Sequence, residues 1–592
     1  MLASFRWLKE LCPVDVDAAE LAHRLTQAGL EVEAMVPKGQ GLDGVVIAEV
    51  RAKRPHPKRD KLSLVTVFDG EVERELVCGA SNVPEPGGRV LFARTGAVLP
   101  NGIEIQPRKL GGIESSGMIC SEVELDIGVD ADGIFVVAPE MDAKPGEPVA
   151  DALQLRDTIF DIGLTPNRPD CLGHVGIARE MALLLGQTWT APAITAPSRV
   201  FSPGPAFAAS EPTEDLRPLW SGASAEAPRP SLPSVSVRIE DSSRCPRYGA
   251  ALVHGVEVGP SPFWLRYRLH LLGLRALSNV VDVTNLVLLE WGHPIHGFDL
   301  RHLRGNQVVV RRALEGERMA TLDGIERTFT ADDLLICDAE GPVAVAGVMG
   351  GADSEIRDDT SDVLIECAYF DPRSVRRTSR RLGLHTDSSH RFERGVDPQA
   401  VPRVLARAAS LIAELGGGSA ADRAIDHIAK PFVPTSIHFR PSRASRLLGS
   451  EIAPELSREL LEAVGCELES VDADSFNAKA PSWRPDLGRE VDLIEEVARI
   501  RGYEQIETAV PKVHPSVTGT APLLRFTGRL RDAAAEAGLF EAVNFSFVSR
   551  DDLHGARVPE EAVALANPLS EERSVMRTSL LPGLMAAVVH AQ

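Results

Sequence analysis

The chain is 592 residues long, and this length is the strongest constraint on what it can fold into. A single hydrophobic core stops growing at roughly 250–300 residues, so longer chains divide into domains that each bury an interior of their own. We therefore expect a modular protein whose motifs have to be interpreted one module at a time.

The composition excludes a membrane protein. Hydrophobic residues make up 44% of the chain and charged residues 25%, and no apolar run is long enough to cross a bilayer. The first residues alternate polar and apolar side chains at helical spacing and lack the continuous apolar core of a signal peptide. A cytoplasmic protein is expected.

Cysteine usage and charge limit the remaining classes. The eight cysteines are scattered singly, without a CxxC pair that could begin a zinc site or a redox centre, so we expect reduced and mostly buried thiols. A formal net charge of -21 argues against a protein that coats nucleic acid by bulk attraction, because phosphate binding needs clustered Lys and Arg. Any contact with RNA must be local.

Hydrophobic patterning divides the chain into segments. The first segment is typical of two short helices, and short β-rich runs such as VVIAEV and LSLVTVF, punctuated by Gly and Pro, then predict a small all-β barrel. A later Pro-, Ala-, Ser- and Glu-rich range cannot bury enough surface to fold alone and predicts a linker or insertion. The chain stops inside a helical pattern, from which we expect a truncated sequence. The expected segments are 1–39 with 152–190, 40–151, 191–233, 234–427, 431–508 and 514–592.

The barrel segment carries three motifs: HPKRDKL (56–62), CGASN (78–82) and SSGMICSEVEL (115–125). They resemble the tRNA-binding oligonucleotide/oligosaccharide-binding (OB) fold of phenylalanyl-tRNA synthetase β subunits. The accompanying cluster of cations suits contacts that track a phosphate backbone, although a short charge run by itself favours a solvated loop. The cluster consists of Lys53, Arg54, Lys58, Arg59 and Lys61.

The stretch TPNRPDCLGHVGIARE (165–180) resembles the same family, in which it packs with the N-terminal helices into one domain split by the barrel. Its Asn-Arg pair, flanked by prolines, starts a turn before a helix. We expect a structural role for it and no catalytic one.

Two central segments, NVVDVTNLVLLEWGHPIHGFD (279–299) and VLIECAYFDPRSVRRTSRRLGLHTDSSHRFERGVDP (363–398), resemble the editing module of bacterial phenylalanyl-tRNA synthetase. The resemblance implies hydrolysis of tyrosine wrongly attached to tRNA(Phe). It maps the editing histidine onto His296, the carboxylate that recognises the tyrosine hydroxyl onto Glu366, and a polar pocket residue onto Thr386. The chain departs from the family's TDASHR pattern at Ser388, which stands in place of alanine and leaves pocket size and polarity open.

The chemistry of editing asks for these residue types. A largely apolar synthetic pocket rejects an isostere with one extra hydroxyl by only ~100-fold, so a second, hydrolytic site is the remedy. An acceptor such as Glu366 would favour the phenol and be left unpaired by phenylalanine. Attack of water on an ester needs positioning and oxyanion support, which His296 and Thr386 could provide.

Two neighbouring patterns have simpler interpretations. His293 and His296 form an HxxH pair, which in isolation is usually a packed or surface pair, and we reject zinc because no further ligand spacing accompanies it. Four arginines on the following helix are equally compatible with a solvated face and with contact to the acceptor end of tRNA. They are Arg376, Arg377, Arg380 and Arg381.

The segment PSWRPDLGREVDLIEEVARIRGYEQI (481–506) predicts a helix with three carboxylates on one face. From spacing alone, ion pairs of Glu495 and Glu496 with Arg499 are the better interpretation. The resemblance implies a different role, in which the aligned carboxylates bind magnesium together with an α subunit. The implied ligands are Asp486, Asp492, Glu495 and Glu496.

The final run ANPLSEERSVMRTSLLPGL (566–584) resembles the degenerate class II synthetase domain of the same subunit, which makes no adenylate itself. The expected fold is thus a multidomain α+β protein: a split N-terminal helical domain with an inserted OB-fold β-barrel, an α/β editing module, a small α+β metal-associated domain, and the start of a degenerate class II domain.

The implied function is that of a β subunit. The resemblance implies ATP-dependent attachment of phenylalanine to tRNA(Phe), with ATP as a substrate of the holoenzyme and an α subunit forming the adenylate in an (αβ)₂ heterotetramer. A stand-alone tRNA-binding or trans-editing protein is the alternative, and the carboxylate helix and synthetase-like tail argue against it. A purely structural scaffold with an inert pocket is the third possibility.

Overall fold

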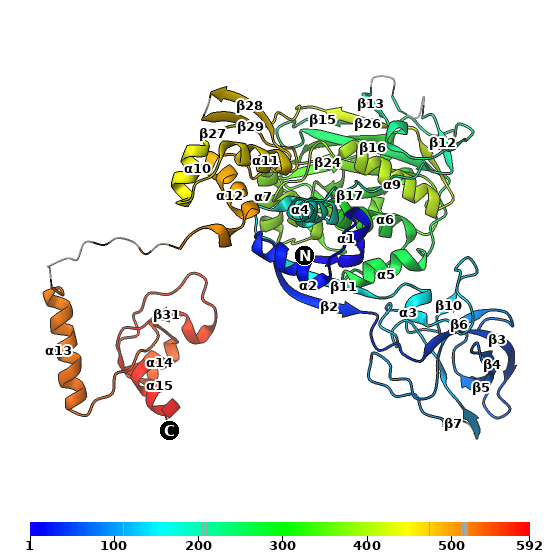
Figure 1. Ribbon diagram of the computed structural model, residues 1–592, viewed down its shortest axis with the longest axis horizontal. Coiled ribbons are helices and arrows are strands. Elements are labelled where there is room, and N and C mark those ends of the chain that lie inside the picture. Colours follow the sequence, from blue (N-terminus) through cyan, green and yellow to red (C-terminus); the bar gives the residue numbers. More distant parts are fainter. Residues whose placement is uncertain are drawn as a thin grey trace. The chain divides into compact units, whose positions relative to one another are not determined.

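The computed structural model describes residues 1–110, 112–203, 207–208, 211–472, 474–508, 510, 513 and 519–591. The chain divides into two compact units, Met1–Glu507 and Thr508–Gln592 (Figure 1). Residues 204–206 and 209–210 of the predicted insertion, and 514–518 at the predicted start of the last domain, lie outside the described residues. Among the helices described, none combines the length and hydropathy needed to cross a membrane.

The N-terminal segment folds together with a segment that follows the β-rich region. Strand β11 (Asp157–Gly163) pairs antiparallel with β1 (Leu2–Ser4) on one side and β2 (Glu31–Lys38) on the other. Helices α1 (Phe5–Leu11), α2 (Ala18–Gln27) and α4 (His174–Leu185) pack around this sheet. The two predicted helices are confirmed, but β2 was missed, because its side chains are largely exposed and show no alternating pattern.

The β-rich region forms a six-stranded antiparallel sheet in the order β10-β6-β3-β4-β5, with β9 also paired to β6. Apolar side chains of β3, β4 and β6 alternate toward a small core. A hairpin of two further strands, β7 and β8, lies outside the hydrogen-bonded path, and helix α3 (Val149–Ala152) follows. The strand bounds are β3 Val45–Pro55, β4 Ser63–Phe68, β5 Glu73–Cys78, β6 Arg89–Ala93, β7 Arg108–Leu110, β8 Ile113–Ser115, β9 Met118–Ile119 and β10 Val136–Val137.

A larger, eight-stranded sheet positions the candidate site. Its strand β16 is buried almost throughout and pairs with β24, which pairs with β17. Helix α9 (Val401–Leu415) packs on β16 and β24 and against α6 (Asn279–Trp291), while α5 (Phe263–Leu271) contacts α6 (Figure 1). The strands are β12 Arg199–Phe201, β13 Thr213–Asp215, β14 Ala225–Glu226, β16 Arg247–His254, β17 Ile295–Asp299, β24 Val363–Tyr369, β25 Ser419–Ala421 and β26 Arg423–Ile428.

Three of these strands come from the range predicted as a linker or insertion. β12 pairs with β25 and β14, and β13 pairs with β26. Each strand is only two or three residues long and depends on partner strands for its hydrogen bonds. The described part of 191–233 is therefore an insertion held by strand pairing and not a free linker.

A second, five-stranded sheet in the order β15-β18-β21-β22-β23 packs beside the first through a shared apolar core. A separate hairpin joins β19 and β20. The bounds are β15 Ser236–Ile239, β18 Gln307–Arg312, β19 Arg318–Ala320, β20 Glu326–Thr328, β21 Leu334–Cys337, β22 Pro342–Val345 and β23 Met349–Gly350. Helices α7 (Pro372–Leu382) and α8 (Asp387–Phe392) follow β24.

The last part of the first unit is a small α+β fold. A three-stranded antiparallel sheet in the order β27-β29-β28 packs against three helices around its own core. The elements are β27 Ser436–Phe439, α10 Pro441–Leu448, α11 Pro454–Val464, β28 Glu467–Asp472, β29 Ser475–Lys479 and α12 Glu490–Arg501.

The second unit contains helices α13 (Pro522–Glu536), α14 (Arg550–Gly555) and α15 (Leu581–Ala591), and a two-stranded pairing of β30 (Phe547–Val548) with β31 (Val575–Met576). Its described core is small, and many of its large apolar side chains are exposed.

All eight cysteines are free and buried, which confirms the prediction that they lie in the interior.

Candidate functional site

His296 and Glu366 face one another across two paired strands. β17 and β24 run antiparallel, and the register places the Cα of His296 opposite the Cα of Glu366. Directly opposed residues project to the same face of a sheet. Both side chains line a cavity of about 100 Å³, whose wall also includes Met349, Ser388 and Phe392. The two motif segments thus converge on one cavity.

Glu366 is neutral in this setting. Its side chain is buried, and burial raises the pKa of the carboxyl to about 8. The fully buried Tyr248 on β16 donates its Oη–H to Oε2 of Glu366 at 3.2 Å, which opposes part of the shift. A protonated carboxyl can donate one hydrogen bond and accept others. The sequence does not point to Tyr248, because no motif joins β16 to the two segments and only strand pairing brings it close.

His296 is neutral as well, for the opposite reason. Burial lowers the pKa of its imidazole to about 4. The ring packs edge-on against Phe298, with centroids 4.6 Å apart, and its Nε2 has no hydrogen-bond partner among the described residues. Gly350 leaves room for the ring, since a Cβ there would stand 2.6 Å from Cε1 of His296. A neutral imidazole nitrogen at a cavity wall can hold a water molecule or a hydroxyl group.

Thr386 does not belong to this cavity. It is the N-cap of α8: its Oγ1 accepts from Ser389 N at 3.0 Å and donates to Val348 O at 2.7 Å. It lines a separate hollow together with Met1 and other residues. The structure therefore does not bring the Thr386 hydroxyl into the cavity of His296 and Glu366, because helix capping turns it toward the backbone.

Ser388, in the first turn of the same helix, does line the cavity. Its Oγ donates to the carbonyl of Gly347 at 3.2 Å. The hydroxyl of Ser388 is thus tied to the wall, and its two lone pairs add polarity to the cavity.

His293 has a packing role. It is buried, its Nε2–H donates to Ala368 O at 2.9 Å, and its ring packs edge-on against Phe392 with centroids 6.1 Å apart. Burial lowers the pKa of its imidazole. These contacts support the interpretation of His293 as a packed histidine.

The predicted cation cluster of the β-rich region separates into two groups. Lys53 donates to Val83 O at 2.6 Å, and Arg54 forms an ion pair with Glu75 at 2.6 Å. Lys58, Arg59 and Lys61 are exposed on the loop between β3 and β4 and form no ion pair with any described residue. The second group thus carries charges that no described acidic residue neutralises.

The arginines of α7 divide in the same way. Arg381 is bonded to Asp333, and Arg377 lies 3.6 Å from Asp332. Arg376 and Arg380 are exposed and have no acidic partner in the described part of the chain. Both interpretations of this helix face remain compatible with the geometry.

The predicted magnesium carboxylates do not gather into one site. Asp492 accepts from the N–H groups of Gly488 and Arg489 at the start of α12, and Glu495 is exposed. Asp486 and Glu496 are both bound by the guanidinium of Arg484, with N···O distances of 2.7 and 2.8 Å. A cation would have to displace that guanidinium, so these residues do not fit a magnesium ion held by this chain alone.

Glu496 belongs to a buried ion network that sequence analysis missed. Arg499 bonds both Glu496, as the spacing predicted, and Glu180 of α4. Arg168 bonds Glu180 and Asp170. The arginines hold the pKa of the Glu496 carboxyl below its usual range. The network joins α4 and its preceding loop to α12. Its members Glu180 and Arg499 are 319 positions apart in the sequence.

One group of potential metal ligands does meet within the described residues, formed by Asp170, Cys171 and Glu180. Arg168 occupies it, donating to both carboxylates and to Cys171 Sγ at 3.1 Å. Burial raises the pKa of the thiol well above its usual range, which disfavours the thiolate that a metal needs. The group is an ion-pair centre.

Four family models match the chain. They are described as a putative tRNA binding domain (residues 45–148), a B3/4 domain (244–417), a tRNA synthetase B5 domain (437–503) and a phenylalanyl tRNA synthetase beta chain CLM domain (506–592). The cavity of His296 and Glu366 lies in the range of the second.

Similar proteins span nearly the whole chain. The phenylalanine–tRNA ligase beta subunits of Geobacter sulfurreducens and Geobacter metallireducens are each 44% identical to it, over 99% of this chain and 70% of the relative. A solved N-terminal fragment of the phenylalanyl-tRNA synthetase beta-subunit from Pyrococcus horikoshii is 16% identical, covers 58% of this chain and 87% of that one, and gives a TM-score of 0.29. On the identity and coverage of the two Geobacter relatives, the chain belongs to the phenylalanine–tRNA ligase beta subunit family.

Proposed function

We propose that this chain is the β subunit of a phenylalanine–tRNA ligase. A separate α subunit would form the adenylate from ATP and phenylalanine, and this chain would bind tRNA(Phe), support the α active site and hydrolyse misacylated tyrosyl-tRNA(Phe). An (αβ)₂ heterotetramer working in the cytoplasm is part of the proposal. The names of the relatives support the ligase activity, and the match of residues 45–148 to a putative tRNA binding domain supports the binding of tRNA.

The segments take roles within this proposal. Residues 1–39 with 152–190 form the split N-terminal domain, 40–151 the OB-fold tRNA-binding domain, 234–427 the editing module, 431–508 the small α+β domain, and 514–592 the beginning of a non-catalytic class II-like domain. The pairing of β1 and β2 with β11, on either side of the β-rich region, supports the split domain.

The observation that carries the editing role is the buried carboxyl of Glu366 opposite His296 in one cavity. The cavity is smaller than the ~300–1,000 Å³ of pockets that hold a whole ligand. It therefore suits the amino-acid side chain alone, with the ribose and adenine of the tRNA's terminal nucleotide outside. A tyrosyl phenol reaching Glu366 would exchange hydrogen bonds with the carboxyl. A phenyl ring would bury the same carboxyl without that partner, at a cost that disfavours phenylalanine.

Hydrolysis then requires a positioned water molecule. The oxygen of water attacks the ester carbonyl, the bond to the ribose oxygen breaks, and the proton lost by the water goes to that ribose oxygen. The products are tyrosine and free tRNA. His296 is neutral at pH 7, so its unpaired Nε2 acts by hydrogen bonding to the water or to a ribose hydroxyl and not as a charged acid. Thr386 would contribute indirectly, by capping the helix that carries Ser388.

A magnesium site shared with an α subunit at Asp486, Asp492, Glu495 and Glu496 stays a prediction. No step of the proposed editing reaction requires it.

Reconstitution tests the proposal. The chain is mixed with the cognate α subunit, and complex formation, phenylalanyl-tRNA synthesis and deacylation of tyrosyl-tRNA(Phe) are measured. We expect a stable complex that performs both reactions. Deacylation without a complex would indicate a stand-alone editor, and a complex without deacylation would indicate a scaffold with an inert pocket.

A further inference from the structure

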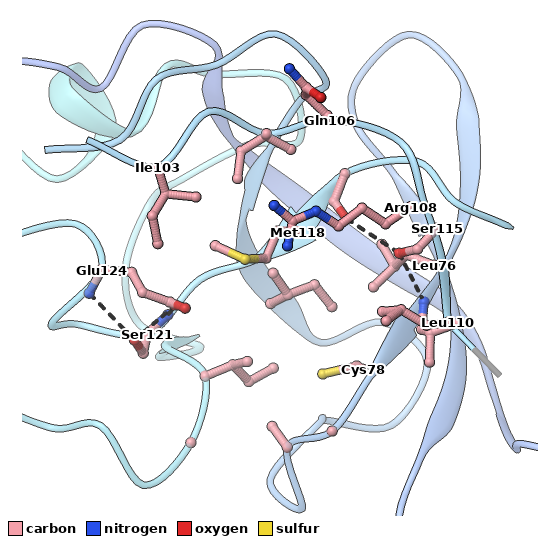
Figure 2. A pocket seen from close by; sticks show the side chains of 18 of the residues that line it. Leu76, Cys78, Ile103, Gln106, Arg108, Leu110, Ser115, Met118, Ser121 and Glu124 are labelled. Carbon is pink, nitrogen blue, oxygen red and sulfur yellow. Dashed lines mark hydrogen bonds between the residues drawn. The ribbon is translucent and has the colours of Figure 1, made fainter. Parts of the chain in front are cut away.

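A second, larger cavity lies in the β-rich region and takes no part in the editing proposal. It has a volume of about 470 Å³, within the usual range of about 300–1,000 Å³ for small-molecule sites. Its apolar wall comes from β5, β9 and the segment before β10, represented by Leu76, Met118 and Ile134. Figure 2 shows Cys78, Arg108, Met118 and Glu124 arranged around this space.

Glu124 presents a free acceptor to the cavity. Its Oε2 accepts from the backbone N–H of Ser121 at 2.7 Å and from the Ser121 hydroxyl at 2.8 Å, which fixes the carboxylate in one orientation (Figure 2). Its Oε1 has no hydrogen-bond partner among the residues that the structure describes. A carboxylate oxygen can accept two hydrogen bonds, so a ligand with adjacent N–H donors would complete it.

A cation stands on the other side of the same cavity. Arg108, on β7, lines it, is exposed, and forms no ion pair with any described residue; its side chain extends toward Met118 in Figure 2. The turn after β7 brings the free cations of the β3–β4 loop close, since a Cβ on Gly112 would stand 4.0 Å from Nζ of Lys58. The cavity therefore combines an acceptor, apolar walls and a cationic rim that continues into Lys58, Arg59 and Lys61.

We propose that this cavity takes one unpaired guanosine nucleotide of an RNA chain, with the guanine N–H groups on Glu124 and a phosphate on Arg108. The inference rests on the proposed tRNA binding and names the part of the RNA that the domain reads. Guanine is selected because its N1–H and N2–H₂ donors are adjacent on one edge. Adenine and cytosine place an acceptor beside their amino group, which faces a carboxylate unfavourably, and uracil offers a single N–H between two carbonyls.

Mononucleotide titration of the full chain tests the inference. GMP, IMP, AMP and UMP are titrated while binding is followed by calorimetry or ligand-observed NMR. GMP should bind best, and IMP, which lacks the 2-amino group, about tenfold more weakly. Glu124→Gln should lose at least about tenfold in GMP affinity, because the amide turns a donor toward the guanine, and Arg108→Gln should weaken all four nucleotides.

Matched controls come from the β7–β8 hairpin, which carries Arg108. Glu114→Gln and Lys109→Gln remove equal charges from exposed residues of β8 and β7 that do not line the cavity, and both should bind GMP like the parent chain. Thermal unfolding of every variant shows whether a loss reflects misfolding. Arg108→Gln removes no internal ion pair within the described residues, so it still tests the phosphate contact if Glu124→Gln unfolds. The preference of the parent chain for GMP over AMP then tests the guanine contact.

A competition experiment separates this inference from the proposed function. Transfer RNA should displace GMP from the full chain. Three results would overturn the guanosine site while tRNA binding stands: tRNA binds but GMP does not, GMP stays bound at saturating tRNA, or GMP binds no better than AMP. If the chain binds GMP but no tRNA at all, the proposed RNA role and the inference built on it both fail.

Discussion

His296 and Glu366, opposite one another on β17 and β24, form a pair in which neither member is charged at neutral pH. Burial lowers the pKa of the imidazole to about 4 and raises that of the carboxyl to about 8. Between these values the cavity holds a neutral base beside a neutral acid and no ion pair. A neutral pair leaves its hydrogen-bonding groups available for a polar ligand, which suits a site that distinguishes a phenol from a phenyl ring.

Removal of either side chain should impair editing alone. His296→Ala and Glu366→Ala are expected to slow deacylation of tyrosyl-tRNA(Phe) by the reconstituted enzyme at least about tenfold, because each removes a hydrogen-bonding group from a buried site. Formation of phenylalanyl-tRNA should be unchanged. Glu355→Ala, at an exposed glutamate of the same module that does not line the cavity, serves as the control. Normal deacylation by both cavity variants would remove the editing assignment.

The carboxyl of Glu366 should also make folding stability depend on pH. Its pKa is about 8 in the folded chain and about 4.5 in the unfolded one, so the folded chain holds more protons between these values. Stability from this group is complete below pH 4.5 and is lost as the pH rises toward 8. Glu366→Gln cannot ionise and should lose less stability than the parent between pH 5 and pH 8.5, measured by chemical denaturation. Parallel curves for the two proteins would contradict the shift.

Tyr248 should lower the pKa of the Glu366 carboxyl. Its hydroxyl donates to Oε2 and lowers the pKa of the carboxyl, so Tyr248→Phe should raise that pKa above 8 and cost about 1 kcal/mol of stability. Carbon-13 NMR of labelled glutamate would follow the titration. Tyr369→Phe is the matched control, since Tyr369 lies on β24 and its hydroxyl has no hydrogen-bond partner among the described residues. An unchanged titration in Tyr248→Phe would exclude the tuning role.

The sequence predicts this site in part, and the gaps have physical causes. His296, Glu366 and Ser388 could be found because each lies in a long motif, and strand pairing then brings the motifs together. Thr386 lies in the same motif, but motif membership does not say where a hydroxyl points, and capping directs this one to the backbone. Tyr248 belongs to a third strand, and its contact exists only through non-local pairing.

The fold shows the same division between local and non-local information. Helices α1 and α2 and the helix α12 follow from apolar periodicity, and the i,i+3 contact of Glu496 with Arg499 follows from helix geometry. The contacts of Arg484 with Glu496 and of Arg499 with Glu180 depend on how separate segments pack, which periodicity does not encode.

The buried ion network should contribute strongly to stability. Glu180→Gln leaves the guanidinium of Arg499 in the interior with one carboxylate fewer, and breaking such a buried pair costs roughly 3–5 kcal/mol. Urea denaturation should show this loss, while Glu20→Gln, which breaks an exposed helix ion pair with Arg24, should change little. Because the arginines lower the pKa of Glu496, its contribution is present above about pH 4.5 and is lost on acidification below that value.

The same network predicts how magnesium acts. Since Arg484 already binds Asp486 and Glu496, added Mg²⁺ should not shift the thermal midpoint of the isolated chain. If an α subunit supplies further ligands, Asp492→Asn with Glu495→Gln should weaken magnesium-dependent assembly. Equal assembly with and without magnesium would remove the shared site.

The exposed cations of the β3–β4 loop should set the salt dependence of RNA binding. Lys58 and Lys61 have no acidic partner among the described residues, so each is free to release a counterion from a phosphate. Lys58→Ala with Lys61→Ala should weaken tRNA binding and reduce the slope of log K against log salt by about 0.7–0.9 for each phosphate that is no longer neutralised. Lys144→Ala, at an exposed lysine outside the loop, should leave the slope unchanged. Arg54→Ala should act more weakly than either loop lysine, because Glu75 already neutralises that guanidinium. An unaltered slope in the double variant would place the RNA on another surface.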